Sequence, residues 1–293
     1  IELINYERDK SNRAMLASTN ITSWRIEGPF DSNYSLAILN RNLAKALSRV
    51  VKNIVIHNTE GFGDYKLNSD FIKRDSEIYD IYKASLDDNS NCQIVSRNLY
   101  PPRVNDLSAQ LNLLHSYGWE ESEFPSNWVH DFNFNLQGVS VMSRQVKKIL
   151  IDNGVKIPIH ITGLGLDHLI SIEKDLNYKV NAKKFKFLHI SSCFPRKSVD
   201  VLLKSYEHSF TKNDDVTLVI KTFNNPHNNI AELLEKLQSR NHLFPDVLVI
   251  NEELSEAQLK SLYLQCNVFV APSRGEGFGL PIAEAMILQI PVI

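Results

Sequence analysis

The sequence of 293 residues lacks several features that define other protein classes. Its three cysteines are far apart and form no Cys-x-x-Cys pair, which indicates a reducing compartment rather than a disulfide-rich secreted domain. Lysine and arginine total 32 and aspartate and glutamate 34, so a net charge of −2 provides no broad basic surface for nucleic acid. No apolar run reaches about 18 residues, the length that a membrane-spanning helix requires.

The composition is that of an ordinary folded protein, with 43% hydrophobic and 23% charged residues. The length is sufficient for two domains of ordinary size. Residues 1–18 are polar and predict a helix or lead-in of little chemical content. Short apolar segments, typical of buried strands, follow at 22–27, 53–57, 93–96, 110–115, 138–142, 157–161, 185–190, 216–220, 246–250 and 267–272.

Helical periodicity separates many of these strands, for example at residues 36–47, 199–210 and 230–237. Ser143 is placed to cap one helix, and Ser255 with Gln258 forms a capping box before another. Repeated alternation of strand and helix favours parallel sheets with helical crossovers. We therefore predict an α/β protein with two Rossmann-like doubly wound domains.

The stretch from Ser273 to Met286 is the most informative part of the chain. Gly275, Gly277 and Gly279 alternate between a short strand and a predicted helix. Pro281 suits the first helical turn, where its missing N–H costs nothing. A glycine-rich loop that leads into a helix start predicts an anion site, because free amides and the helix dipole both face it.

Two carboxylates flank this predicted anion site, Glu276 in the loop and Glu284 in the helix. An ionised carboxylate only accepts hydrogen bonds, so it suits hydroxyl groups rather than phosphate. Amides for phosphate and carboxylates for hydroxyls indicate a nucleotide-sugar pocket. The spacing of two glutamates is weak evidence by itself, since glutamate is commonly solvated on a helix face.

The complete string is more specific. Ser-Arg-Gly-Glu-Gly-Phe-Gly-Leu-Pro, then Glu-Ala-Met and a final Pro-Val-Ile, closely resembles the donor-site motif of group 1 glycosyltransferases. These are retaining enzymes of the GT-B fold, in which two Rossmann-like domains face a cleft. The resemblance implies that Glu276 lies against the donor sugar as a catalytic residue and that Glu284 binds the ribose. It also implies donor contacts along the loop at Gly277, Phe278, Gly279 and Leu280.

Four residues at the start of the second domain bear on the donor phosphates. The resemblance implies that Lys197 is the lysine that family members carry near the end of this loop, and it is assigned to catalysis. Ser192 occupies the position where family members carry an arginine. A serine cannot replace a guanidinium group, which puts phosphate affinity in question. Arg196 could compensate or could be a solvated charge. Lys221, at the carboxyl end of a strand, either faces the ligand side of the sheet or is surface-exposed.

The first domain is expected to bind the acceptor. Gly28 and Asp31 lie in the loop after its first strand, although a plain turn would also explain the glycine. His115 ends a strand where family members often carry a catalytic histidine, and a purely structural role is the alternative. Trp119 and Glu120 follow in an aromatic and acidic loop that suits carbohydrate; a tryptophan buried under the loop is equally open.

The domain boundary and the chain ends follow from the same resemblance. Gly-Leu-Gly-Leu-Asp at residues 163–167 resembles the family's domain junction. We predict an acceptor-side domain at 1–168 and a nucleotide-sugar-binding domain at 169–293. The chain begins with Ile1 and stops where family members continue, so we expect a fragment of a longer polypeptide with a truncated C-terminal domain.

The resemblance implies transfer of a hexosyl group from a nucleotide sugar to a hydroxyl acceptor with retention of configuration, in polysaccharide or glycoconjugate synthesis. The acceptor would be a saccharide or a lipid-linked saccharide, and the departing phosphate would take its proton. No Asp-x-Asp occurs in the chain, so we expect no metal and no other cofactor.

The expected location is cytoplasmic, which includes peripheral association with the cytoplasmic face of a membrane. Other domains of the same polypeptide are further expected partners. One alternative is a non-catalytic nucleotide- or carbohydrate-binding module, a degenerate transferase domain of a larger protein. Another is a sugar phosphorylase of the same fold, but no motif for its pyridoxal-phosphate lysine is present.

Overall fold

The computed structural model describes residues 21–32, 34–86 and 92–293. The helix or lead-in predicted for residues 1–18 lies outside the described residues. The chain divides into two compact units, residues 1–164 and 165–293. Each unit has its own sheet and its own hydrophobic clusters.

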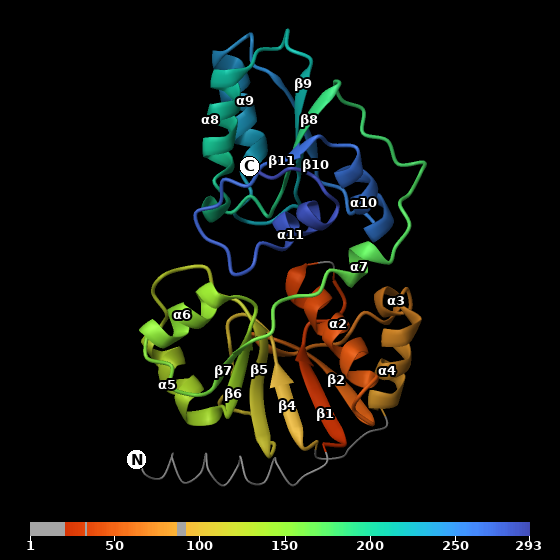
Figure 1. Cartoon of the computed structure of the whole chain (residues 1–293), viewed down its shortest axis with the longest axis vertical. Coiled ribbons are helices and arrows are strands. Elements are labelled where there is room, and N and C mark those ends of the chain that lie inside the picture. Colours follow the sequence, from red (N-terminus) through yellow and green to blue (C-terminus); the bar gives the residue numbers. More distant parts are fainter. Residues whose placement is uncertain (1–20, 33, 87–91) are drawn as a thin grey trace. The chain divides into compact units, whose positions relative to one another are not determined.

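Unit 1 is built on a seven-stranded sheet with the order β3-β2-β1-β4-β5-β6-β7 (Figure 1). Its pairs are parallel except for the short hairpin of β2 and β3. Neighbours of β1 are β2 on one side and β4 on the other, so the strand order reverses at β1. The strands are β1 (Ser23–Gly28), β2 (Asn53–Glu60), β3 (Gly63–Asp64), β4 (Ile94–Arg97), β5 (Leu111–Tyr117), β6 (Gly138–Val141) and β7 (Ile159–Ile161).

The helices of unit 1 bury apolar side chains against this sheet. Helices α2 and α4 pack beside β1 and β2, and α6 packs beside β6 and β7 (Figure 1). Ser143 caps α6 as predicted, because its side chain accepts a hydrogen bond from the backbone N–H of Val146. The helices are α2 (Ser35–Ser48), α3 (Ser69–Ile72), α4 (Ser76–Leu86), α5 (Ser126–Asn135) and α6 (Arg144–Asp152).

The sequence patterns predict no helix over residues 126–135, where the structure has α5. The structure begins the helix at Ser126, directly after Pro125, which occupies the N-cap position. Phe132 on this helix is buried in the cluster that also holds Tyr117 and Phe124. Aromatic residues are weak helix formers, so packing of this face rather than intrinsic propensity stabilises α5.

Unit 2 has a four-stranded parallel sheet with the order β10-β9-β8-β11. Its first helix, α7 (Asp167–Ile170), begins at the last residue of the predicted domain junction at 163–167. The capping box of Ser255 and Gln258 is present as predicted and starts α10. The other elements are β8 (Phe185–Ile190), the 3-10 turn η1 (Pro195–Lys197), α8 (Val199–Ser209), β9 (Val216–Lys221), α9 (Ile230–Arg240), β10 (Asp246–Ile250), α10 (Glu256–Leu264), β11 (Val268–Phe269) and α11 (Leu280–Ile287).

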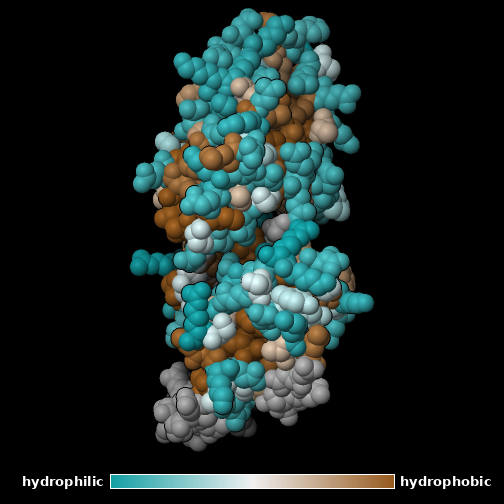
Figure 2. Space-filling view, turned by 90° about the vertical axis from the view of Figure 1, so that its right-hand side faces the viewer, coloured by the Kyte–Doolittle hydropathy of each residue, from teal (hydrophilic) through white to brown (hydrophobic). Residues whose placement is uncertain are grey.

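The predicted α/β class with parallel sheets is therefore confirmed in both units. Apolar and hydrophilic side chains both reach the surface on the face shown in Figure 2. Exposed apolar side chains such as Phe62 and Leu176 are normal for folded proteins and do not by themselves indicate a binding surface. Within the ranges described above, no helix combines the length and the apolar character needed to cross a bilayer.

Candidate functional site

The strand order of unit 2 locates its ligand-binding edge. Strand β8 has β9 on one side and β11 on the other, so the strand order reverses between β8 and β11. Ligands of open parallel sheets bind outside the carboxyl ends of the strands at such a reversal. Two loops leave the sheet there, residues 191–198 after β8 and residues 270–279 after β11. The two loops that carry the predicted donor residues therefore leave the sheet at the same edge.

Direct contacts join the two loops. The backbone N–H of Arg274 donates to the carbonyl oxygen of Arg196 at 2.8 Å. The guanidinium of Arg196 donates to the carbonyl oxygen of Gly275 at 3.2 Å. One loop thus fixes the other, although the two are about 80 residues apart in sequence.

The carboxylate of Glu276 lies at the centre of this junction. Its Oε1 accepts hydrogen bonds from Ser273 Oγ at 2.7 Å and from Lys197 Nζ at 2.5 Å. Arg196 Nη1 lies 3.7 Å from Oε2. Side chains of Glu276 and Lys197 are 23% and 12% exposed. The structure therefore brings together three predicted donor-site residues in a partly buried cluster that contains two cations and one anion.

The loop leads into helix α11, and of its three glycines only Gly279 has a left-handed backbone conformation. Gly279 has φ +79°, in the left-handed region, and is the N-cap residue of α11. Pro281 lies in the first turn as predicted. No side chain of the N-cap residue occupies the first-turn amides, because glycine has none. The amide groups from Gly277 to Leu280 and the N-terminal end of the helix dipole are therefore suited to a phosphate group.

Replacing Gly279 with alanine is expected to lower the free energy of unfolding by about 1–2 kcal/mol, the usual cost of left-handed backbone for a residue with a Cβ. The added Cβ would also lie 3.0 Å from Cδ1 of Ile282. Urea unfolding of the purified chain measures this change. Gly138→Ala is the matched control, because Gly138 has no positive φ and its new Cβ would make only ordinary contacts at 3.5 and 3.6 Å. Equal stability of the Gly279→Ala variant and the wild type would contradict the need for glycine at this left-handed N-cap position.

Glu284, in the second turn of α11, is a buried carboxylate with 4% of its surface exposed. Tyr263 Oη donates to its Oε2 at 2.8 Å, and His168 Nε2 lies 2.9 Å from its Oε1. Burial and the charge of Glu284 raise the pKa of Tyr263 well above its ordinary value, so the hydroxyl stays protonated and donates. The sequence interpretation assigned no role to Tyr263 or His168.

Lys221 is the last residue of the neighbouring strand β9, and Ser192 lies in the loop after β8. Lys221 Nζ donates to the carbonyl oxygen of Thr222 at 2.6 Å, and burial lowers the pKa of this lysine. The carbonyl oxygen of Ser192 accepts from Asn225 Nδ2 at 2.9 Å. The backbone N–H of Ser191 bonds to the carbonyl oxygen of Lys221 at 3.1 Å, which places the two strand ends side by side.

A histidine that the sequence interpretation did not single out connects β8 with β11. His189 Nδ1 lies 2.8 Å from the carbonyl oxygen of Val270, and its Nε2 lies 2.8 Å from Ser191 Oγ. Because a carbonyl oxygen only accepts, Nδ1 carries the proton and Nε2 accepts from the serine hydroxyl. Burial lowers the pKa of His189 and favours this neutral form. His189 therefore fixes the first residue of the loop that carries Lys197.

In unit 1, His115 and Gly28 meet the same asparagine. His115 Nε2 donates to Asn40 Oδ1 at 2.8 Å, and Asn40 Nδ2 donates to the carbonyl oxygens of Pro29 and Asn98. Gly28 has φ +150°, and a Cβ there would lie 2.3 Å from Asn40 Nδ2. Burial lowers the pKa of His115 to about 3. Near neutral pH this imidazole is therefore uncharged and acts as a hydrogen-bond donor.

The other acceptor-side predictions fall on two loops of unit 1. Asp31 accepts hydrogen bonds from Tyr65 Oη at 2.9 Å and from the backbone N–H of Asn68 at 2.7 Å. Glu120 is half-buried near Tyr117. Its carboxylate adds to the effect of burial, which raises the pKa of the Tyr117 phenol.

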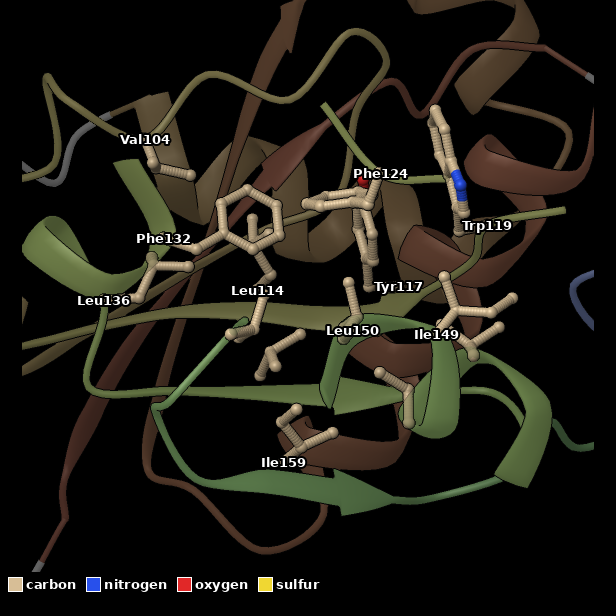
Figure 3. Packing of buried hydrophobic residues seen from close by; sticks show 14 residues of the cluster. Val104, Leu114, Tyr117, Trp119, Phe124, Phe132, Leu136, Ile149, Leu150 and Ile159 are labelled. Carbon is tan, nitrogen blue, oxygen red and sulfur yellow. The ribbon is translucent and has the colours of Figure 1, made fainter. Parts of the chain in front are cut away.

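Trp119 lies in the core of unit 1 rather than on an open surface (Figure 3). Its indole is 9% exposed and packs edge-on against Phe124 with ring centroids 5.1 Å apart. Nε1 donates to the carbonyl oxygen of Glu123 at 2.8 Å. The packing leaves little of the indole face for stacking on a sugar. These contacts therefore fit the alternative interpretation, in which Trp119 is a tryptophan buried under the loop.

Metal-ligating residues do not cluster in the described part of the chain: no group of three or more histidine, cysteine, aspartate or glutamate side chains there could hold a metal ion. The three cysteines Cys92, Cys193 and Cys266 are all buried.

Sequence comparison places the second unit in a known context. Residues 172–293 match the family model "Glycosyl transferases group 1". WbdA of Escherichia coli, a serotype-specific mannosyltransferase, is 30% identical over 107 residues. These residues make up 36% of this chain and only 13% of that relative.

Solved structures resemble nearly the whole chain. Sucrose-phosphate synthase from Thermosynechococcus elongatus has a TM-score of 0.65 and 16% identity, covering 92% of this chain and 80% of its own. HepE from Anabaena, in complex with UDP-glucose, has a TM-score of 0.60 and 13% identity, covering 92% of this chain and 79% of its own. Identities this low show the fold alone. That fold is GT-B, as predicted.

Proposed function

We propose that the chain, whose residues 172–293 match the group 1 glycosyl transferase family model, transfers a sugar from a nucleotide-sugar donor to a hydroxyl acceptor with retention of configuration. The observation that carries this proposal is the cluster of Lys197, Glu276 and Ser273 at the strand-order reversal of unit 2. Glu276 and Ser273 lie on the loop that leads into the start of α11 at Gly279. Cations, free amides and carboxylates therefore meet at one edge of the sheet, as a nucleotide sugar requires.

The phosphate end of the donor is assigned to Lys197, Arg196 and the amides from Gly277 to Leu280. Lys197 and Arg196 already lie beside a carboxylate, with Nζ at 2.5 Å and Nη1 at 3.7 Å. Their charge would offset the negative charge that develops on the diphosphate when the glycosidic bond breaks. The proposal assigns this role to side chains and the helix dipole rather than to a metal ion.

The sugar end of the donor is assigned to Glu276. A carboxylate has about four acceptor sites, and Ser273 and Lys197 share Oε1, so Oε2 can accept from sugar hydroxyls. In the reaction, the bond from the anomeric carbon to the phosphate oxygen breaks and its electron pair stays on the phosphate. The acceptor oxygen bonds to the same face of that carbon, and its proton passes to the departing phosphate. The products are a nucleoside diphosphate and a glycoside.

Unit 1 is assigned the acceptor, with Gly28 and Asp31 after β1 and Glu120 after β5. Strand order also reverses at β1, whose neighbours are β2 and β4, which favours ligand binding beside Gly28. We propose a saccharide, free or lipid-linked, as the acceptor and the cytoplasm as the location. The three cysteines are far apart and form no Cys-x-x-Cys pair, which favours a reducing compartment.

The first experiment is a panel of UDP- and GDP-sugars offered to the polypeptide that carries this sequence. Calorimetry measures binding, and mass spectrometry measures release of the nucleoside diphosphate and formation of a glycoside with simple sugar acceptors. We expect one donor to bind and to be turned over, with hydrolysis to the free sugar when no acceptor is present. Binding of none of the donors would contradict the proposal.

One observation favours a second candidate, a non-catalytic nucleotide-binding module. Ser192 stands where the resemblance expects an arginine, and Arg196 is engaged with the carbonyl oxygen of Gly275. A site with weaker positive charge could bind a nucleotide without supporting bond cleavage. Binding of a nucleoside diphosphate without hydrolysis or transfer of any sugar in the panel would establish this second function.

A further inference from the structure

Three helices of unit 2 meet at the buried carboxylate of Glu284. Glu284 lies on α11, Tyr263 on α10 and His168 on α7, and the contacting atoms are 2.8 and 2.9 Å apart. The side chains of His168 and Glu284 are both 6% exposed. Burial of a carboxylate is costly unless hydrogen bonds replace its water, and these two donors supply that replacement.

The protons of this cluster follow from its geometry. The carboxylate only accepts, so Tyr263 Oη and His168 Nε2 are both donors. Tyr263 Oη also lies 3.2 Å from the carbonyl oxygen of Pro281, a longer contact than the 2.8 Å to Glu284. Nδ1 of His168 is buried and has no hydrogen-bond partner among the described residues.

Each oxygen of Glu284 is held by one donor. Oε1 is bound by His168 and Oε2 by Tyr263, so one acceptor site remains on each oxygen. A free glutamate side chain rotates about three bonds, and ordering it on ligand binding costs entropy. Here that ordering is complete before a ligand binds. The arrangement suits a ligand that offers two hydroxyl groups on adjacent carbons.

We propose that His168 and Tyr263 are positioning residues that orient Glu284 for the 2′- and 3′-hydroxyls of the donor ribose. This inference rests on the proposed function, and it takes from the family resemblance the expectation that Glu284 binds the donor ribose. The pair would make the site selective for ribonucleotides over nucleotides that lack these hydroxyls. Neither side chain needs to touch the ligand, since each acts through the carboxylate.

Tyr263→Phe tests the proposal because it removes only the hydroxyl group. Calorimetry on the full chain compares UDP and GDP with their 2′,3′-dideoxy analogues. Loss of one hydrogen bond to a charged group is expected to weaken binding of the preferred ribonucleotide about tenfold. Affinity for the dideoxy analogue is expected to stay unchanged, because that ligand does not use the carboxylate.

Tyr206→Phe is the matched control. Tyr206 is also a buried tyrosine of unit 2, and its hydroxyl donates to a backbone carbonyl oxygen, that of Asp246, at 3.0 Å. Its removal is expected to leave the affinity ratio of the two nucleotides unchanged. A ratio unchanged in Tyr263→Phe, including an equal loss of affinity for both nucleotides, would overturn the positioning role and leave Tyr263 with a structural one.

A pair of His168 variants decides the question if Tyr263→Phe does not fold. His168→Gln keeps an N–H donor, whereas His168→Leu removes it. We expect the leucine variant to lose the preference for the ribonucleotide and the glutamine variant to recover most of it. Equal behaviour of the two variants would overturn the inference. If wild-type chain binds neither UDP nor GDP, the proposed function itself fails, and this outcome is distinct from an unchanged ratio in a binding-competent variant.

Discussion

Glu276→Gln is expected to lower the turnover number about 10²- to 10³-fold, the usual loss when one electrostatic contact to the reacting group is removed. Glutamine keeps the shape of the side chain and one acceptor oxygen. It loses the charge that holds Lys197 at 2.5 Å and that accepts hydrogen bonds from the donor sugar. Folding should change little, because glutamine fills the same space and keeps an oxygen that accepts the hydrogen bond from Ser273 Oγ.

Steady-state kinetics with the donor identified by the panel, together with thermal unfolding, measures both effects. Glu232→Gln is the control, since Glu232 is an exposed glutamate in the first turn of α9. That control should match the wild type in turnover and in stability. Wild-type turnover in Glu276→Gln would remove this carboxylate from the reaction, and a large loss of stability would assign it a structural role.

Lys197→Gln is expected to weaken binding of the nucleoside diphosphate about 10- to 100-fold, which corresponds to about 1.4–2.8 kcal/mol. The lysine is 12% exposed, so solvent screens its charge less than that of a surface lysine. Its removal also leaves the charge of Glu276 without its closest cation, and that charge would then repel the diphosphate.

Calorimetry with the nucleoside diphosphate and with the corresponding nucleoside distinguishes the contribution of the phosphates to the affinity from that of the base and the ribose. Only the diphosphate should lose affinity in Lys197→Gln. Lys204→Gln, on the exposed side of α8, controls for the change in net charge and should bind like the wild type. Equal loss for nucleoside and diphosphate would show that Lys197 does not act on the phosphates.

Local sequence patterns predicted most of the secondary structure. The capping box at Ser255 and the cap at Ser143 depend on residues three positions apart, and both are present in the structure. The apolar strands of both units also occur near the predicted positions. Helix α5 was missed because its residues are aromatic and follow Pro125, and the contact that stabilises it, at Phe132, involves residues distant in sequence.

The candidate site was only partly predictable for the same reason. The motif around Glu276 and Gly279 is continuous in sequence, so the sequence alone locates it. The partners of Glu284 are 21 and 116 residues away, and no spacing rule connects them. The burial of His115 and its bond to Asn40, 75 residues away, likewise depend on how the strands of unit 1 pair.

In the proposed site, the loops after β8 and β11 bind the diphosphate of a nucleotide sugar. A crystal structure of the chain with the nucleoside diphosphate selected by calorimetry tests it most directly. We expect the diphosphate within hydrogen-bond distance of Lys197 Nζ and the amides from Gly277 to Leu280, with the ribose hydroxyls at Glu284. Nucleotide bound elsewhere, for example in the pocket between α9 and β10 lined by Ile230, Leu234 and Val249, would contradict it.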